Sequence, residues 1–327
     1  MNATSTQFVI LAGILGSGKT SLLEALLDLG GGASTAVIVN EVGAINIDGA
    51  VLSESARGMT MATLSNGCVC CSLTNDLVTT VEALVALREE AGQQPLERIV
   101  LECSGLSRPG AVIRSLEQLA RLRFRLHIVA TYDCSRPPLD RDFDDACAQL
   151  TAAQTVVLTK IDLVSPDRRA QARSVVAGIN PMARIVDEST ASIRAREAFA
   201  EVDTSLPPQI VHSEPTQVSE TLLHPRVRVF RARFTQRPNW EDVLDWLENI
   251  AGMTGDRLLR MKAIVAGPPG SDRVLLQSVG TTFAAPRRLA TTAFDDLAAV
   301  FIVRDCAMVE LQQVEGALGV TWTALQR

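Results

Sequence analysis

The sequence predicts an α/β protein in which a doubly wound, mostly parallel sheet is followed by a smaller C-terminal α+β domain. Short apolar segments alternate with helical patterns over the first ~200 residues, as in a sheet built from strand–helix–strand units. A glycine-rich loop joins the first of these segments to the first helical pattern. Farther along, polar and apolar residues alternate, which is typical of antiparallel strands. We therefore expect two domains, spanning residues 1–215 and 216–327.

Segments rich in Val, Ile and Leu are the predicted strands of the parallel sheet, because such runs suit strands that are buried on both faces. They lie at Phe8–Ala12, Thr35–Asn40, Glu97–Glu102, Leu126–Thr131, Gln154–Thr159 and Ala183–Val186. Helical patterns fill the intervals at Thr20–Leu29, Asn75–Glu90, Pro109–Leu122, Asp142–Leu150 and Pro166–Ile179. Pro109 and Pro166 favour these helix starts, since the first turn of a helix tolerates proline.

The stretch Asp187–Pro225 is predicted to be a helix followed by an interdomain linker, because its prolines and scattered polar residues do not suit a strand. Beyond it, strands are predicted at Arg226–Phe234, Leu258–Val265, Arg273–Val279, Phe283–Leu289 and Ala298–Val303, with helices at Asn239–Ile250 and Met308–Leu318. We expect four arginines of the first strand on one face, either as part of a docking surface or as an ordinary solvated face. They are Arg226, Arg228, Arg231 and Arg233.

Composition and charge exclude several classes of partner. The net charge of −6 argues against nucleic acid and against an anionic membrane. No apolar run approaches the ~20 residues that a membrane-spanning helix needs. The first apolar stretch, Phe8–Leu15, is short and follows no basic residue, unlike a signal peptide. Seven cysteines, an odd number in a long chain, favour a reducing compartment, so we expect a cytoplasmic protein.

The loop Gly13–Thr20 reads Gly-Ile-Leu-Gly-Ser-Gly-Lys-Thr, which matches the Walker A pattern between a strand and a helix. Its glycines let backbone N–H groups point at phosphate oxygens, Lys19 can reach the β- and γ-phosphates, and the Thr20 hydroxyl can bind Mg²⁺. The alternative is a glycine-rich turn without a ligand. The motif predicts a P-loop NTPase fold with nucleotide bound by Gly13, Gly16, Ser17, Gly18, Lys19, Thr20 and Ser21.

A second phosphate-side element is predicted where the strand Glu97–Glu102 ends. The Glu102 carboxylate can hold Mg²⁺ through a water or orient the attacking water, and the Gly105 N–H can bind the γ-phosphate. We take Lys19, Glu102 and Gly105 as candidate catalytic residues. The alternative is an ordinary strand end followed by a turn.

The segment Thr159-Lys160-Ile161-Asp162 follows another predicted strand and is the candidate base site. The Asp162 carboxylate can accept hydrogen bonds from N1 and N2 of guanine, whereas adenine offers neither donor in that geometry. The stem of Lys160 can lie along the base. Thr159 stands where GTPases commonly have asparagine. A solvated Lys and Asp after a strand is the alternative, and a P-loop ATPase or small-molecule kinase is the rival function.

Three cysteines within four residues, Cys68, Cys70 and Cys71, can converge on one soft cation. Glu41 is the candidate carboxylate ligand beside them. The alternative is that the cysteines are small buried apolar residues. We expect the remaining cysteines, which are dispersed, and His127 to be structural rather than ligands. The dispersed cysteines are Cys103, Cys134, Cys147 and Cys306.

Taken together, these motifs resemble those of the CobW-like metal-handling GTPases. In chain order they are Gly13–Thr20, Asn40-Glu41-x-Gly43, Ile47-Asp48-Gly49, Asn66-Gly67-Cys68-x-Cys70-Cys71, Glu102-x-Ser104-Gly105 and Thr159-Lys160-x-Asp162. The resemblance extends to the C-terminal α+β region. It implies GTP hydrolysis to GDP with Mg²⁺, and a metal site formed by Cys70, Cys71, Cys68 and Glu41.

The resemblance also implies delivery of a metal, zinc or cobalt, to a client metalloprotein. The sequence departs from that of many members in two ways. Ala44 replaces a second acid after Asn-Glu-x-Gly, and the chain has no histidine-rich stretch, which argues against metal storage. A GTP-gated metal sensor with little turnover remains an alternative function. A monomer and a homodimer are both compatible with the sequence.

Overall fold

The computed structural model describes residues 5–30, 34–40, 51–54, 60–64, 72–138, 142–201, 226–268, 273–289, 297–314 and 318–325. The chain forms two compact units, one of residues 1–170 and 184–202, the other of residues 171–183 and 203–327. The predicted boundary at residue 215 lies outside the described residues and stays a prediction. No helix in these ranges is long and apolar enough to cross a membrane.

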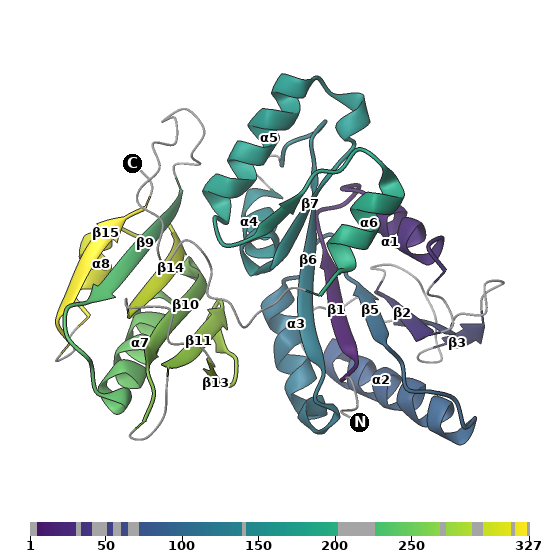
Figure 1. Ribbon diagram of the computed structural model, residues 1–327, viewed down its shortest axis with the longest axis horizontal. Coiled ribbons are helices and arrows are strands. Elements are labelled where there is room, and N and C mark those ends of the chain that lie inside the picture. The colour runs from purple at the N-terminus through teal and green to yellow at the C-terminus, as the bar shows by residue number, and fades with distance from the viewer. Residues whose placement is uncertain are drawn as a thin grey trace. The chain divides into compact units, whose positions relative to one another are not determined.

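The first unit contains a sheet with strand order β3-β4-β2-β5-β1-β6-β7-β8 (Figure 1). All neighbours are parallel except β3 and β4. The strands are β1 Gln7–Ala12, β2 Thr35–Asn40, β3 Val51–Glu54, β4 Thr60–Leu64, β5 Arg98–Glu102, β6 Arg125–Asp133, β7 Thr155–Thr159 and β8 Arg184–Val186. The six predicted strands are therefore confirmed. The sequence analysis missed β3 and β4, whose short, mixed sequences lack a continuous apolar run.

Helices cover both faces of this sheet, which confirms the doubly wound fold. They are α1 Lys19–Leu27, α2 Ser72–Glu90, α3 Pro109–Leu116, α4 Phe143–Ala152 and α6 Ala191–Phe199. A further helix, α5 Pro166–Ile179, links β7 to β8 along the chain and spans the boundary between the two units. Leu22, Leu26 and Phe199 bring α1 and α6 into one apolar cluster with Val9 and Val129 of the sheet. The connection through α1 runs toward β2, whereas α3 carries the chain back across the sheet to β6. Because both crossovers are right-handed, the two helices lie on opposite faces.

Parallel register brings several strand ends to one edge of the sheet. Leu11 of β1 pairs with Glu102 of β5, and Asp133 of β6 pairs with Thr159 of β7. The chain leaves β1 for one side of the sheet and later returns on the other side, so a topological switch point lies at β1. In open α/β sheets ligands bind beyond the carboxyl ends of the strands at such a point.

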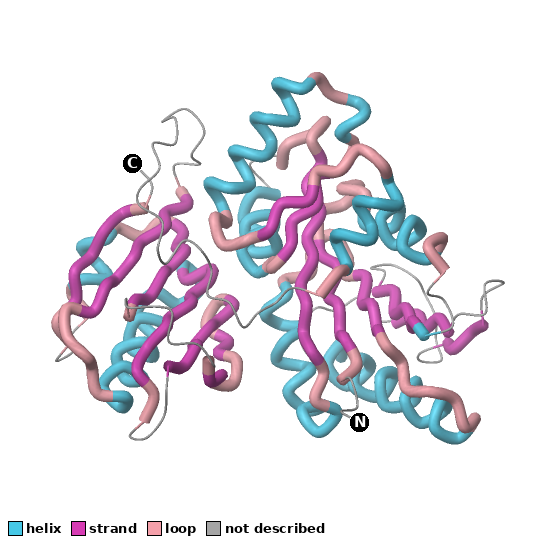
Figure 2. The backbone as a smooth tube through the Cα atoms, in the orientation of Figure 1, coloured by secondary structure: helices cyan, strands magenta, loops and turns pink. Residues whose placement is uncertain are grey.

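The second unit contains an antiparallel sheet, which Figure 2 shows in magenta with its helices in cyan. The strand order is β12-β11-β10-β14-β9-β15, and β13 pairs with β11. The elements are β9 Val227–Phe234, α7 Trp240–Thr254, β10 Leu258–Ala266, β11 Arg273–Val279, β12 Thr282–Phe283, β13 Arg287–Arg288, β14 Ala298–Arg304, α8 Met308–Gln312 and β15 Val320–Ala324. The α+β prediction is confirmed. The predicted last helix is shorter, and β15 was not predicted.

The prediction that four arginines share one face of β9 is wrong. Phe230 and Ala232 join the apolar cluster that includes Trp246 of α7. Because side chains alternate along a strand, Arg231 and Arg233 lie on the opposite face, whereas Arg228 lies on the α7 side. The apolar pattern shifts by one residue at Val229 and Phe230, which are both buried. Arg226 precedes the strand and forms an ion pair with Asp305 at 2.8 Å.

His127 has the structural role that the sequence predicts. It is buried in β6, where its ring nitrogens contact Gln7 Nε2 at 3.2 Å and Thr155 Oγ1 at 3.1 Å. Burial, reinforced by the charges of Arg184 and Arg98, lowers the pKa of His127 from 6.5 to about 4. The ring is therefore neutral in the folded protein at pH values where it is protonated in the unfolded chain.

We expect the free energy of unfolding to depend on pH through His127. The folded-state pKa is depressed, so protons bind preferentially to the unfolded chain as the pH falls from 6.5 to about 4. The stabilisation is complete above pH 6.5, and about 3 kcal/mol of it should be lost by pH 4. Urea unfolding at several pH values measures this loss. His127→Gln should lack it, and an equally steep pH profile in that variant would contradict the assignment.

Candidate functional site

The loop between β1 and α1 is built on three glycines with positive φ angles, Gly13 at 147°, Gly16 at 76° and Gly18 at 90°. A Cβ atom on Gly13 would lie 2.1 Å from Thr131 Oγ1 and 2.5 Å from Ser17 Oγ. Ser17 Oγ in turn donates to the carbonyl oxygen of Ile14 at 2.7 Å. The loop therefore needs glycine for its backbone conformation and for its packing on β6.

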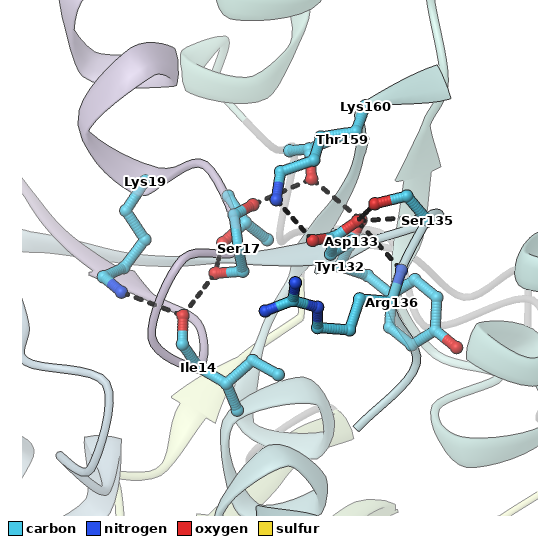
Figure 3. Close-up of polar contacts among 10 residues, drawn as sticks. Ile14, Ser17, Lys19, Tyr132, Asp133, Ser135, Arg136, Thr159 and Lys160 are labelled. Atoms are coloured by element: carbon cyan, nitrogen blue, oxygen red, sulfur yellow. Dashed lines mark hydrogen bonds and ion pairs between the residues drawn. The ribbon is translucent and has the colours of Figure 1, made fainter. Parts of the chain in front are cut away.

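Lys19 is buried at the start of α1 and folds back over the loop. Its Nζ donates to the carbonyl oxygen of Gly13 at 2.8 Å. It also donates to that of Ile14 at 3.2 Å, as Figure 3 shows. Burial lowers the pKa of Lys19, and the nearby Glu102 carboxylate opposes that shift. The protein thus holds a desolvated cation beside a curled backbone, which is an arrangement that suits a phosphate group.

Thr20 and Glu102 meet at the same edge of the sheet. Thr20 Oγ1 donates to Glu102 Oε1 at 2.7 Å, and the Glu102 side chain is buried where β5 ends. A hydroxyl and a carboxylate are hard oxygen ligands, and Mg²⁺ prefers such ligands together with phosphate oxygens. The donor set therefore fits Mg²⁺ bound with a nucleotide. The structure brings these two predicted residues together although they are far apart in sequence.

Gly105, in the loop after β5, touches the glycine-rich loop. A Cβ atom on Gly105 would lie 2.5 Å from the backbone nitrogen of Leu15 and 3.0 Å from its Cα. The Gly105 carbonyl accepts a hydrogen bond from Gln149 Nε2 of α4 at 2.8 Å. Two backbone segments are therefore packed against each other beside Lys19, and there is no room for a side chain at position 105.

Thr159 joins the candidate base site to the phosphate loop. Its Oγ1 donates to the carbonyl oxygen of Ser17 at 2.8 Å and lies 3.1 Å from that of Tyr132. A Cβ atom on Gly18 would lie 3.3 Å from Thr159 Cβ. The hydroxyl thus binds the backbone of the loop, so Thr159 positions the loop relative to β7. That it also contacts a nucleotide stays a prediction.

Lys160 and Asp162 follow β7 in different settings. Lys160 has a left-handed backbone with φ 52°, and its Nζ lies 2.5 Å from Asp133 Oδ2. Asp162 is exposed in the short 3-10 helix η4, Ile161–Leu163. Asp133 was not predicted as a site residue, because the predicted strand ended at Thr131. The presence of an acidic residue at the end of an apolar strand could have indicated it.

The predicted metal ligands Glu41, Cys68, Cys70 and Cys71 lie outside the described residues, so their roles stay predictions. Within the described ranges, no three His, Cys, Asp or Glu residues are grouped as a metal site. The dispersed cysteines Cys103, Cys134, Cys147 and Cys306 are buried and form no disulfide with one another. Burial raises the pKa of Cys103 to about 12, so its thiol stays protonated and is a poor metal ligand.

Comparison with known proteins supports this picture of the two units. Residues 7–187 match the model of the CobW/HypB/UreG nucleotide-binding domain. Residues 227–317 match the C-terminal domain of the cobalamin synthesis protein cobW. The two matches cover the parallel sheet with its glycine-rich loop and the antiparallel sheet, respectively.

Similar proteins include two that are named zinc chaperones. The zinc chaperone YjiA of Escherichia coli is 27% identical over 282 residues, covering 84% of this chain and 86% of that protein. The zinc chaperone CobW of Pseudomonas aeruginosa is 31% identical over 216 residues, covering 55% and 56%. The crystal structure of Zn(II)-bound YjiA GTPase from E. coli matches 96% of this chain and 98% of that one, with a TM-score of 0.67 and 22% identity. That likeness supports the fold, and the family matches show that the chain belongs to the CobW/HypB/UreG family.

Proposed function

We propose that this protein is a GTP-hydrolysing zinc chaperone. In this proposal Mg²⁺-GTP binds at the glycine-rich loop, and Zn²⁺ is held by Cys68, Cys70, Cys71 and Glu41 for delivery to a client metalloprotein. The observation that most supports this proposal is the hydrogen bond between Thr20 and Glu102 beside the buried Lys19. The names of the similar proteins, zinc chaperone and GTPase, support the choice of metal and nucleotide.

Hydrolysis of GTP would use residues of the glycine-rich loop and of the adjacent end of β5. Backbone N–H groups of the loop and the Lys19 ammonium would bind the β- and γ-phosphates and stabilise the charge that develops during cleavage. Thr20 and Glu102 would hold Mg²⁺, which supplies charge neutralisation when bound. Glu102 would also orient the attacking water, and the Gly105 N–H would donate to the γ-phosphate. Burial of Lys19 and Glu102 strengthens these interactions because it removes competing water.

Selection of guanine would depend on Asp162. Its carboxylate accepts hydrogen bonds from the N1 and N2 groups of guanine, and an adenine base would leave it without these donors. Asp162 is exposed, so its oxygens are accessible to a base. Competition between GTP and ATP for the wild-type protein discriminates this proposal from a P-loop ATPase or a small-molecule kinase.

The sheet supports a link between the metal residues and the nucleotide site. Val39 of β2 pairs with Glu102, and Asn40 pairs with Leu64 of the parallel strand β4. Glu41 follows Asn40 in the chain, and the cysteine cluster follows Leu64 and precedes α2. Both segments therefore leave the sheet at the edge where Glu102 and Thr20 meet. A nucleotide that orders this edge can bring the thiolates and the carboxylate together.

We expect metal and nucleotide binding to be coupled. By linkage, GTP should tighten zinc by the factor by which zinc tightens GTP, and couplings of about 1–3 kcal/mol predict at least a fivefold difference between the GTP-analogue and GDP forms. Titration with Co²⁺, followed by thiolate charge-transfer absorption, measures this difference. The absorption should disappear in a Cys70→Ser, Cys71→Ser double variant.

A matched control is Cys306→Ser, since this cysteine lies in the second unit and is not among the proposed metal ligands; its Sγ donates to the Ala307 carbonyl oxygen at 3.7 Å. It should retain the full signal and the coupling. Equal metal affinity in the GTP-analogue, GDP and nucleotide-free forms would exclude the chaperone mechanism, even if the cysteines bind metal.

A further inference from the structure

A carboxylate outside all the recognised motifs is built into the base side of the site. Asp133 ends β6, and its side chain is only 4% exposed. Its Oδ1 accepts hydrogen bonds from Ser135 N at 2.8 Å, Ser135 Oγ at 2.6 Å and Arg136 N at 3.2 Å. Its Oδ2 accepts from Lys160 Nζ at 2.5 Å (Figure 3). The turn after β6 therefore fixes the orientation of the carboxylate so that its second oxygen, Oδ2, faces Lys160.

Lys160 needs such a partner to have one defined position. Its backbone is left-handed, a conformation that non-glycine residues rarely adopt. Its side chain is 36% exposed and has four rotatable bonds, so without a partner the ammonium would sample many rotamers. The contact with Asp133 selects one of them and leads the stem back from η4 toward the end of β6.

Two adjacent residues of the base motif are thus held at two different points. Thr159 is bound to the Ser17 carbonyl of the phosphate loop, and Lys160 is bound to Asp133. Asp162 follows directly in η4. The two contacts hold the chain between them, so the position of η4 relative to the phosphate loop depends on both. A bound nucleotide would reach from the phosphate loop, where its phosphates bind, to η4, where its base binds.

We propose that Asp133 is a positioning residue for guanine, which holds Lys160 so that its stem lies along the base and Asp162 meets the base edge. The proposal rests on GTP being the nucleotide of this site. It assigns part of the nucleotide selectivity to a residue that touches no nucleotide itself. The Lys160 ammonium is then paired with Asp133. Lys160 therefore contributes its aliphatic stem, and not its charge, to base binding.

The electrostatics of Asp133 agree with this role. Burial alone would raise the pKa of Asp133, but the hydrogen bonds from Lys160 and Ser135 outweigh it and bring the pKa below 3.8. The carboxylate of Asp133 is therefore ionised near neutral pH, as its contact with the Lys160 ammonium requires.

The test compares nucleotide selectivity in Asp133→Asn with that of the wild type. The asparagine oxygen can still accept from Ser135 and Arg136, while its NH₂ group then faces the Lys160 ammonium and repels it. We expect GDP to bind about tenfold more weakly and ADP to bind unchanged, so that the GDP-to-ADP selectivity falls about tenfold, or about 1.4 kcal/mol. Isothermal titration calorimetry with each nucleotide measures both constants.

A double-mutant cycle with Lys160→Met shows whether Asp133 acts through Lys160. Lys160→Met should lower selectivity to a similar extent, and adding Asp133→Asn should lower it no further. Independent, additive losses would overturn the proposal, as would wild-type selectivity in either single variant. The Lys160→Met arm keeps the proposal testable if Asp133→Asn fails to fold.

Ser135→Ala separates positioning of Lys160 from support of the turn. It removes one hydrogen bond to Asp133 Oδ1 and leaves the ion pair with Lys160 in place. If Asp133 served only its own turn, Ser135→Ala would lower selectivity as much as Asp133→Asn does; we expect selectivity to be retained. A wild-type protein that binds ADP as tightly as GDP would refute the proposed GTP function itself, whereas a selective wild type with a selective Asp133→Asn variant would refute only this inference.

Discussion

Replacement of Lys19 by alanine is expected to lower GTP hydrolysis by at least about a hundredfold, the scale of losing one preorganised charge at a transition state. Lys19 is a buried cation on the phosphate loop, and its ammonium lies within hydrogen-bonding distance of two loop carbonyls. A phosphate that enters the loop would meet this charge beside the loop carbonyls. Phosphate release at saturating Mg²⁺-GTP measures the effect.

Lys19→Met separates charge from packing, because it keeps most of the stem volume that alanine removes. We expect both variants to lose activity equally and to stay folded, with a stability cost of about 1–2 kcal/mol for the lost hydrogen bonds. Arg114→Ala removes an exposed positive charge from α3 and should leave hydrolysis unchanged. Hydrolysis near the wild-type rate in folded Lys19→Met would refute the assignment of the phosphate site.

A single added methyl group at Gly105 should have the second large effect. In Gly105→Ala the new Cβ would lie 2.5 Å from the backbone nitrogen of Leu15, and backbone cannot rotate away as a side chain can. The phosphate loop must therefore shift. We expect GDP affinity to fall at least about a hundredfold, or about 2.7 kcal/mol, and stability to fall by about 1–3 kcal/mol from overpacking. Calorimetric titration and thermal unfolding measure the two quantities.

Gly252 provides the matched control for this substitution. It lies in α7, and a Cβ atom there would meet nothing within 4 Å. Gly252→Ala should leave GDP affinity unchanged and stabilise α7 by up to about 1 kcal/mol, since alanine favours a helix. If Gly105→Ala binds GDP as the wild type does, the packing of the β5–α3 loop on the phosphate loop is not needed for nucleotide binding.

Much of the parallel sheet could be predicted from the sequence because its strands carry local signals. The predicted strands are short apolar runs, most of them buried on both faces, although the edge strand β8 is only partly buried. The turn chemistry of Gly13–Thr20 specifies a strand–loop–helix junction. The strands β3 and β4, of which β3 is the edge strand, were not predicted because four or five mixed residues carry little periodicity. The arginines of β9 were assigned to the wrong face of the strand. Two successive residues are buried, and this shifts the alternation of buried and exposed residues by one position.

The contact between Thr20 and Glu102 could also be predicted from the sequence. Both residues follow strands of one parallel sheet, so once the motifs place each at a carboxyl end, the sheet brings those ends to the same edge. Their chemical roles, like those of Lys160 and Asp162, remain predictions that depend on the nucleotide experiments. The proposed metal-binding roles of Glu41 and the three clustered cysteines rest on the sequence and on chain connectivity alone.

By itself, then, the sequence determined the order of strands and helices along the chain and the position of the phosphate loop. It also supplied the candidate residues for binding a nucleotide and a metal. Only the tertiary structure decided that Asp133 meets Lys160, that the Thr159 hydroxyl binds the Ser17 carbonyl, and that position 105 has no room for a side chain. The physical reason is that these contacts join segments that follow different strands of the sheet, where a shift of one residue in register would replace every partner. Composition and periodicity describe each segment alone and carry no information about that register.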